Sequence, residues 1–260
     1  MLANQFSVEL KRAFTWKRVL LWLSIIFLLP LLRFFMIKDG YQFFEKQEVF
    51  QEMVSAIIPL VFPVLIIMVY LPSFLHEKRN NFITYTRTRV EVSKYLLSKG
   101  MVNALLTGAV VFFMMLFAFI FAFYIEPAIG MIYYYPMDEY SVVREVTFSE
   151  LLTYGELFYG IVYAIWVAVN AVIYSTIAFL LLLVVNNAFV ALSVPFLFYH
   201  VFNFITGVFD VPMFSPLSTL FPFNIVAQPI WTVFVPFFVL IFGLAATSIY
   251  IMRNRKEWMI

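Results

Sequence analysis

Long runs without a charged side chain constrain this chain more than any other feature. No Asp, Glu, Lys or Arg occurs from Leu157 to Phe209, a stretch of 53 residues. A helix needs about 20 mostly apolar residues to cross the hydrocarbon of a bilayer. The run is too long for one crossing and has the length of two, with Asn186 and Asn187 as the natural turn between them.

The overall composition points the same way. Hydrophobic residues make up 64% of the 260 residues and charged residues only 12%, whereas a soluble domain carries about 25% charged residues. A soluble chain with this much apolar surface would expose large patches and aggregate. The 33 Phe, 15 Tyr and 5 Trp exclude a disordered chain, and the lack of cysteine excludes disulfides and thiolate metal sites. We therefore expect an all-α polytopic membrane protein.

The charge-free runs predict five membrane-spanning helices, and a sixth is expected near the start of the chain, where Arg33 lies close to the end of the apolar run. All six belong to a single transmembrane permease domain, residues 1–260. Four prolines between positions 212 and 229 rule out a clean crossing there. Residues 208–229 are instead expected to enter the outer leaflet as short re-entrant helices. The predicted spans are about 19–37, 53–75, 100–125, 157–184, 188–207 and 230–252.

The basic residues predict an orientation for these spans. One side of the predicted topology carries 13 basic and 4 acidic residues, a net charge of +9, and the other carries 4 basic and 11 acidic residues, a net charge of −7. Lys and Arg are enriched in cytoplasmic loops. We expect a multi-pass protein of the cell (plasma) membrane with both termini in the cytoplasm.

The first 17 residues predict an amphipathic helix on the inner membrane surface. An ordinary cytosolic extension is the alternative. The apolar stripe at helical spacing consists of Leu2, Phe6, Leu10, Ala13 and Phe14. The polar residues Glu9, Lys11 and Arg12 are expected on other faces of the helix.

Three regions together resemble the ABC transporter type-2 permeases. The first is V-E-L-K-R-A-F-T-W-K-R-V-L-L-W at 8–22, followed by an apolar run that ends at Pro30. The second is the polar segment 76–99 after the second span, and the third is S-P-L-S-T-L-F-P-F-N at 215–224. The Gly-Thr pair and second acidic residue usual in the family's inner loop are absent here.

The resemblance implies the permease subunit of an ATP-driven exporter. Such a subunit pairs with a second permease subunit, identical or homologous, and with two separate ABC ATPase subunits. It holds no cofactor itself, and ATP and Mg bind the partner ATPase. The chain lacks a G-x-x-x-x-G-K-[ST] phosphate loop, so we expect a non-catalytic subunit, and nothing in its charge points to nucleic acid.

The segment 76–99 is the expected contact with the ATPase. It is too polar for the bilayer and too short for a domain, and its basic and aromatic residues suit a short docking helix. Alternatively, its charges only set the topology. The predicted ATPase-coupling residues are Glu77, Tyr85, Arg87, Arg89, Val90, Glu91, Lys94 and Tyr95.

Polar side chains inside the fourth and fifth spans are the candidate translocation path. Such residues are costly in lipid unless they face protein or water. They either line a path or form hydrogen bonds between helices. The absence of an accompanying intramembrane carboxylate counts against a proton-coupled transporter. The candidates are Asn170, Tyr174, Tyr199, His200 and Asn203.

The dense aromatic residues of the outer segments suggest an amphipathic or hydrophobic cargo, such as a peptide, a lipid-like compound or a drug. Two other functions remain open from the sequence. One is a stand-alone secondary transporter, and the other is a membrane-embedded sensor or assembly factor without transport.

Overall fold

A computed structural model describes residues 2–80, 90–137 and 145–253. Across these residues the regular structure is helical and no strand is present; a single backbone bridge joins Phe43 and Tyr134. The prediction of an all-α protein with six long apolar helices is confirmed.

Six helical stretches are long and apolar enough to cross a membrane, with hydropathies of 1.8 to 2.6. By helix length and hydropathy this is a multi-pass membrane protein. Three stretches are single helices: α5 Ile57–Arg79, α9 Glu156–Val184 and α10 Ala188–Val208. Two consist of three consecutive segments: Trp16–Ile37 contains α2 Trp16–Leu23, η1 Ser24–Leu28 and α3 Leu29–Ile37, and Val92–Ile129 contains α7 Val92–Ile120, η2 Phe121–Ile125 and α8 Glu126–Ile129. The last, Ile230–Arg253, consists of η5 Ile230–Val233 and α12 Phe234–Arg253.

Two of these stretches contain a π-helical turn, and in both a proline follows it at the same spacing. Pro30 comes two residues after η1, and Pro127 comes two residues after η2. A proline donates no backbone N–H and its ring clashes with the carbonyl four residues earlier, which lies inside the π turn in each case. The wider turn accommodates the proline without ending the helix.

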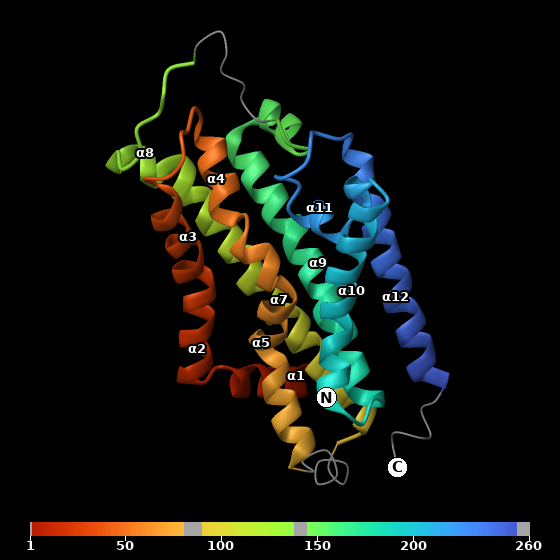
Figure 1. Ribbon diagram of the computed structural model, residues 1–260. Helices are drawn as coiled ribbons and strands as arrows, with labels where there is room; N and C mark the ends of the chain where they lie inside the picture. The colour runs from red at the N-terminus through yellow and green to blue at the C-terminus, as the bar shows by residue number, and fades with distance from the viewer. Residues whose placement is uncertain (1, 81–89, 138–144, 254–260) are drawn as a thin grey trace.

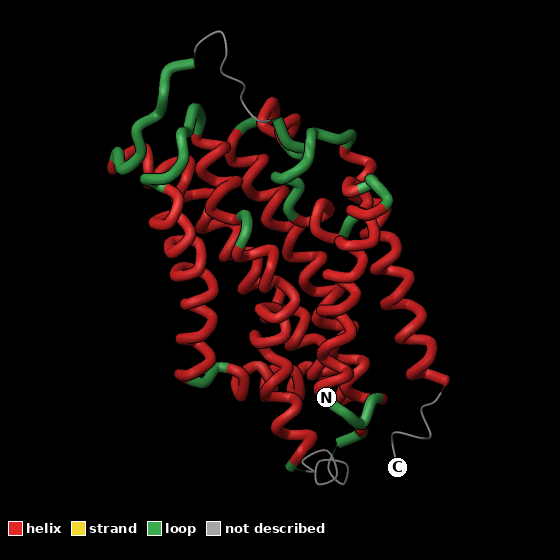
Figure 2. The backbone as a smooth tube through the Cα atoms, in the orientation of Figure 1, coloured by secondary structure: helices red, strands yellow, loops and turns green. Residues whose placement is uncertain are grey.

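The helices α5, α7 and α9 form the centre of the bundle. In each of these three helices at least half of the most apolar 18-residue segment is buried. The buried share of the corresponding segment is 28% in Trp16–Ile37, 22% in Ile230–Arg253 and 17% in α10. Figure 1 shows α2 and α3 on one flank and α12 on the other, and Figure 2 shows that nearly all of the described chain is helical. The outer faces of these peripheral helices are apolar, as lipid contact requires.

Small residues let α7 and α9 pack closely. A Cβ added at Gly108 would lie 3.0 Å from Val172, and one added at Gly160 would lie 2.4 Å from the Phe119 ring. Close backbone approach through small residues is the usual basis of helix packing in membranes. A side-chain hydrogen bond also joins α7 to α9, donated by Asn103 Nδ2 to Ser175 Oγ at 3.2 Å.

Short helices mark the two ends of the bundle (Figure 1). The α1 end is where α1, Leu2–Ala13, lies across the bundle and packs against α7, near the last turns of α5. The α8 end holds α8, the start of α4 (Lys46–Val54) and the 3-10 turn η3 (Ser149–Tyr154). Near the α8 end, η4 (Pro212–Phe214) and α11 (Pro216–Leu220) lie in the connection from α10 to η5.

Helix boundaries around the second and third spans differ from the sequence-based bounds. Residues 38–52, which lie between the first two predicted spans, contain most of α4. The chain breaks between α4 and α5 at Ala56, where φ is +56°. At the other end α5 continues to Arg79, and α7 begins at Val92 rather than at 100. Hydropathy locates the apolar part of a helix but not the polar turns that extend it into water.

Candidate functional site

A buried ionic cluster lies at the α1 end, where three elements far apart in the sequence meet. Lys99 of α7 is 1% exposed, and its Nζ forms an ion pair with the carboxylate of Glu9 on α1. The same Nζ lies 2.8 Å and 2.7 Å from the two carboxylate oxygens of Glu77 on α5. The Tyr95 hydroxyl donates to Glu77 Oε2 at 2.7 Å.

Further donors surround the Glu9 carboxylate, whose side chain is fully buried. Gln5 Nε2 donates to Glu9 Oε1 at 3.0 Å, and Arg12 Nη1 lies 3.3 Å from the same oxygen. Tyr70 of α5 is buried near both carboxylates, and its hydroxyl has no hydrogen-bond partner among the described residues. A carboxylate this deep is stable only because charge and hydrogen bonds compensate its lost hydration.

The corner between α1 and α2 is tied to α5 as well. Arg18 Nη2 donates to Ser73 Oγ at 2.7 Å, and its Nη1 donates to the carbonyls of Arg12 and Ala13 at 3.2 Å. Trp22 Nε1 donates to the carbonyl of Val69 at 3.0 Å. These bonds tie the start of α2 to α5 and, through Arg18, hold the last two residues of α1 at the same corner.

The structure brings together two of the predicted ATPase-coupling residues. Glu77 and Tyr95 lie in the cluster, on the helices that enter and leave the connection between α5 and α7. Val90 packs against the core, and Glu91 pairs with Lys94 at 2.9 Å on the exposed first turn of α7. The other three, Tyr85, Arg87 and Arg89, lie outside the described residues.

The predicted path residues do not form one group. Tyr174 and Tyr199 lie side by side, with ring centroids 6.1 Å apart, and both contact Phe62 of α5. Asn170 donates to the carbonyl of Trp166 on its own helix at 2.9 Å. His200 packs on the ring of Phe196.

Asn203 has a different partner from the rest of that set. Its Oδ1 accepts the backbone N–H of Leu217 at 2.8 Å and so holds the first turn of α11. The other end of α11 is held by α9, through Tyr163 Oη to the Leu220 carbonyl at 2.5 Å and Trp166 Nε1 to the Thr219 carbonyl at 2.8 Å. These bonds satisfy the backbone of a short helix that lies inside the bundle.

Sequence reasoning missed the two buried charges at the centre of the cluster. Glu9 was expected on an exposed face of the N-terminal helix, and this is wrong: Glu9 and Ala13, one turn apart, are the buried residues of α1. Lys99 is the last residue of the polar segment 76–99. No local pattern in the sequence marks either residue, because their burial follows from the packing of α1 on α7.

The cluster joins α1, α5 and α7. Within residues 2–80, 90–137 and 145–253, no group of three His, Asp or Glu side chains could hold a metal ion. Comparison of the chain with protein-family models, with curated proteins and with solved structures finds no match.

Proposed function

We propose that this chain is the membrane permease subunit of an ATP-driven exporter of the ABC type-2 kind, acting with two separate ATPase subunits and a second permease subunit. The observation that carries the proposal is the buried cluster of Glu9, Glu77 and Lys99. It joins both helices that flank the connection 80–91 to the N-terminal helix α1.

A coupling segment must transmit a displacement at its tip to the membrane-spanning helices, and the displacement must not be lost through bending of the segment. Glu77 lies three residues before the connection, and Lys99 lies two turns after the start of α7. The ion pairs between them lock the two helix ends together. Lys78 adds a bond to the carbonyl of Leu182 and so ties the end of α5 to the end of α9.

Two other features support the proposal. The helix α1 packs against α7 at the end of the bundle where α5 ends and α7 begins, as an interfacial helix next to a docking surface would (Figure 1). The short helix α11 lies between the fifth and sixth spans, at the position that the resemblance assigns to re-entrant helices. The cargo we propose is amphipathic or hydrophobic, with ATP and Mg bound on the partner ATPase.

Affinity purification from the native membrane in a mild detergent tests the partnership. We expect an ATPase with a phosphate-loop motif to co-purify, as identified by mass spectrometry, and to hydrolyse ATP. The double substitution Arg87→Glu/Arg89→Glu should abolish co-purification. Arg253→Glu, an exposed basic residue at the same end of the bundle, is the matched control. Absence of any ATPase from the unmodified complex would contradict the proposal.

A second variant tests the cluster's role in coupling. Tyr95→Phe removes one hydrogen bond to Glu77 without leaving a charge unpaired. In the reconstituted complex we expect ATP hydrolysis to persist while transport per ATP falls several-fold. Tyr250→Phe, at an exposed position on α12, is the control and should change neither ATP hydrolysis nor transport. An equal loss of transport per ATP in both variants would show that the cluster does not take part in coupling.

A further inference from the structure

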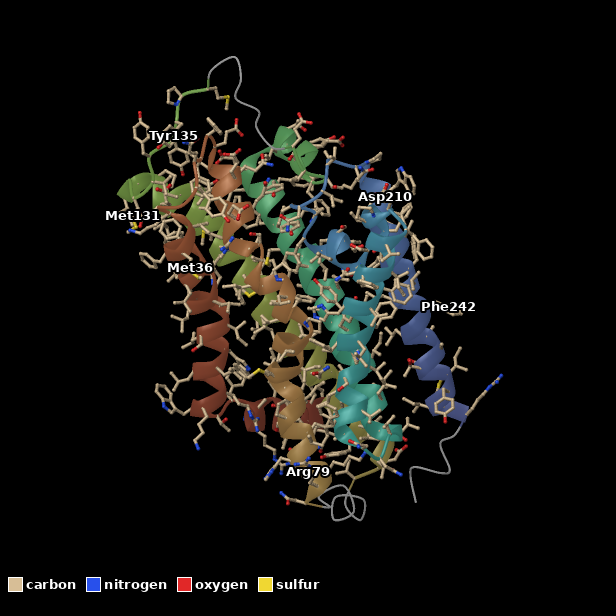
Figure 3. The ribbon with its side chains drawn as sticks, in the orientation of Figure 1. Met36, Arg79, Met131, Tyr135, Asp210 and Phe242 are labelled. Carbon is tan, nitrogen blue, oxygen red and sulfur yellow. The ribbon has the colours of Figure 1, made fainter. Side chains whose placement is uncertain are left out.

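A cavity of about 660 Å³ opens at the α8 end, at the opposite end of the bundle from the ionic cluster. Its walls come from the start of α4, the η2–α8 region, residues 130–134, η3 and the first residue of α9. A volume of this size is in the range of small-molecule sites. Met131 and Tyr135, labelled in Figure 3, lie at this end of the molecule.

Hydrogen bonds within the chain hold the cavity wall formed by residues 130–134 in place. The fully buried carboxylate of Glu126 accepts the backbone N–H of Ile132 at 2.8 Å and a hydrogen bond from the Tyr134 hydroxyl. Burial, and then this hydrogen bond, raises the pKa of the Tyr134 phenol well above its ordinary value. The Tyr135 N–H donates to the Phe43 carbonyl at 2.9 Å and closes the wall against the segment that leads into α4.

The charged side chains of the cavity are less firmly held. Lys46 Nζ lies 3.9 Å from Glu156 Oε1, and both side chains are nearly half exposed, at 44% and 45%. An exposed pair at this distance is weak. The third charged residue, Glu45, caps the first turn of α4 and is engaged there.

Glu156 is therefore the group of the lining that can take a cationic ligand. Because Glu45 is engaged in the cap of α4, Glu156 is the carboxylate that can exchange Lys46 for a better-placed donor. The Tyr124 hydroxyl also lies beside Glu156. Phe44, Phe123 and Tyr134 supply apolar and aromatic surface in the same cavity. Aromatic rings attract an ammonium group and accommodate an apolar body.

We propose that this cavity binds an organic ammonium ion with an aromatic or branched apolar body. The ammonium group replaces Lys46 at the Glu156 carboxylate, and the apolar body packs against Phe123 and Tyr134. The site lies within one chain, so binding does not depend on an ATPase partner or on the proposed export function.

Three probes of matched shape test the charge preference: 4-phenylbutylammonium, 4-phenylbutanol and 4-phenylbutanoate. Binding is measured by calorimetry on the purified full chain in nanodiscs of zwitterionic lipid, with empty nanodiscs subtracted. The expected order is ammonium, alcohol, carboxylate, with at least tenfold between the first two. Binding of the carboxylate as tight as that of the ammonium, or no binding above empty nanodiscs, would overturn the proposal.

Variants locate the site. Glu156→Gln should weaken ammonium binding about tenfold and leave alcohol binding unchanged, whereas Glu150→Gln, an exposed carboxylate on η3 outside the cavity, should change neither. Lys46→Gln removes the competing cation and should tighten ammonium binding about threefold. Ammonium binding unchanged by Glu156→Gln would refute the assignment.

A cavity-filling variant keeps the test decisive if Glu156→Gln fails to fold. Leu152 lines the cavity from η3, and Leu152→Trp should reduce the ammonium and alcohol affinities together, because it occupies the volume of the apolar body. Undiminished binding of both probes in this variant would place them elsewhere and overturn the proposal.

Discussion

The two ends of the bundle hold a fully buried carboxylate in opposite ways. At the α1 end, Glu9 is compensated by the ammonium of Lys99, 90 positions away in the sequence. At the α8 end, Glu126 is compensated by neutral donors, the N–H of Ile132 and the hydroxyl of Tyr134, within eight residues of it. One carboxylate cross-links the tertiary structure, and the other closes a local turn.

This difference indicates what each end can do. A charged cross-link between α1, α5 and α7 resists relative motion of those helices, because separating its members leaves a charge without compensation in a dry environment. The local turn at the α8 end shapes a cavity wall and leaves Lys46 and Glu156 free to change partners. We therefore expect substitutions at the α1 end to have the larger effect on stability.

Lys99→Met should produce the largest loss, about 3–5 kcal/mol, because it leaves Glu9 buried and without its ammonium partner. Thermal unfolding of the detergent-purified protein measures it. Lys94→Met, which breaks the exposed pair with Glu91, is the matched control and should cost less than about 1 kcal/mol. The double variant Glu9→Gln/Lys99→Met should recover part of the loss. Equal stability of the two lysine variants would show that the cluster is not a cross-link.

Tyr134→Phe should cost about 1.5–3 kcal/mol, because it removes a hydrogen bond to a buried carboxylate. Its neighbour Tyr133, which is 72% exposed, provides the control Tyr133→Phe. The same unfolding measurement compares them. If Tyr134→Phe proves as destabilising as Lys99→Met, the contrast between local and cross-linking carboxylates fails.

Gly160→Ala tests the packing of α7 on α9, and it should cost about 1–3 kcal/mol. The new methyl group would lie 2.4 Å from the buried ring of Phe119, which has little room to move. Gly243→Ala is the control, since no atom lies within 4 Å of a Cβ there, and a helical Ala for Gly is neutral or stabilising. A Gly160→Ala protein as stable as the Gly243→Ala protein would mean that the rings at this end repack freely.

Lys46→Gln should have the smallest effect, about 0.2–1 kcal/mol, because its pair with Glu156 is long and half exposed. Unfolding at low and high salt measures it, and the small difference should vanish in high salt. A loss above that range, persisting in salt, would show that the α8 end also depends on charge and would remove the contrast.

Much of the fold was predictable, because the transfer of apolar side chains into lipid depends on local composition. The charge-free runs located five of the six apolar helices, including the two on either side of Asn186 and Asn187, and the apolar run before Arg33 located the first. The polar ends were less predictable. Residues 76–79 belong to α5 and residues 92–99 to α7, because polar turns outside the apolar window remain helical when their side chains find partners across the bundle.

The sequence by itself determined the class of protein and the number of apolar helices, since both follow from how many residues in a row can lose contact with water. The tertiary structure alone decided which charges are buried. Glu9 and Lys99 have ordinary local surroundings in the sequence, and only the packing of α1 on α7 places them together. Whether a charge is exposed or buried depends on residues that are distant in the chain, and no local pattern carries that information.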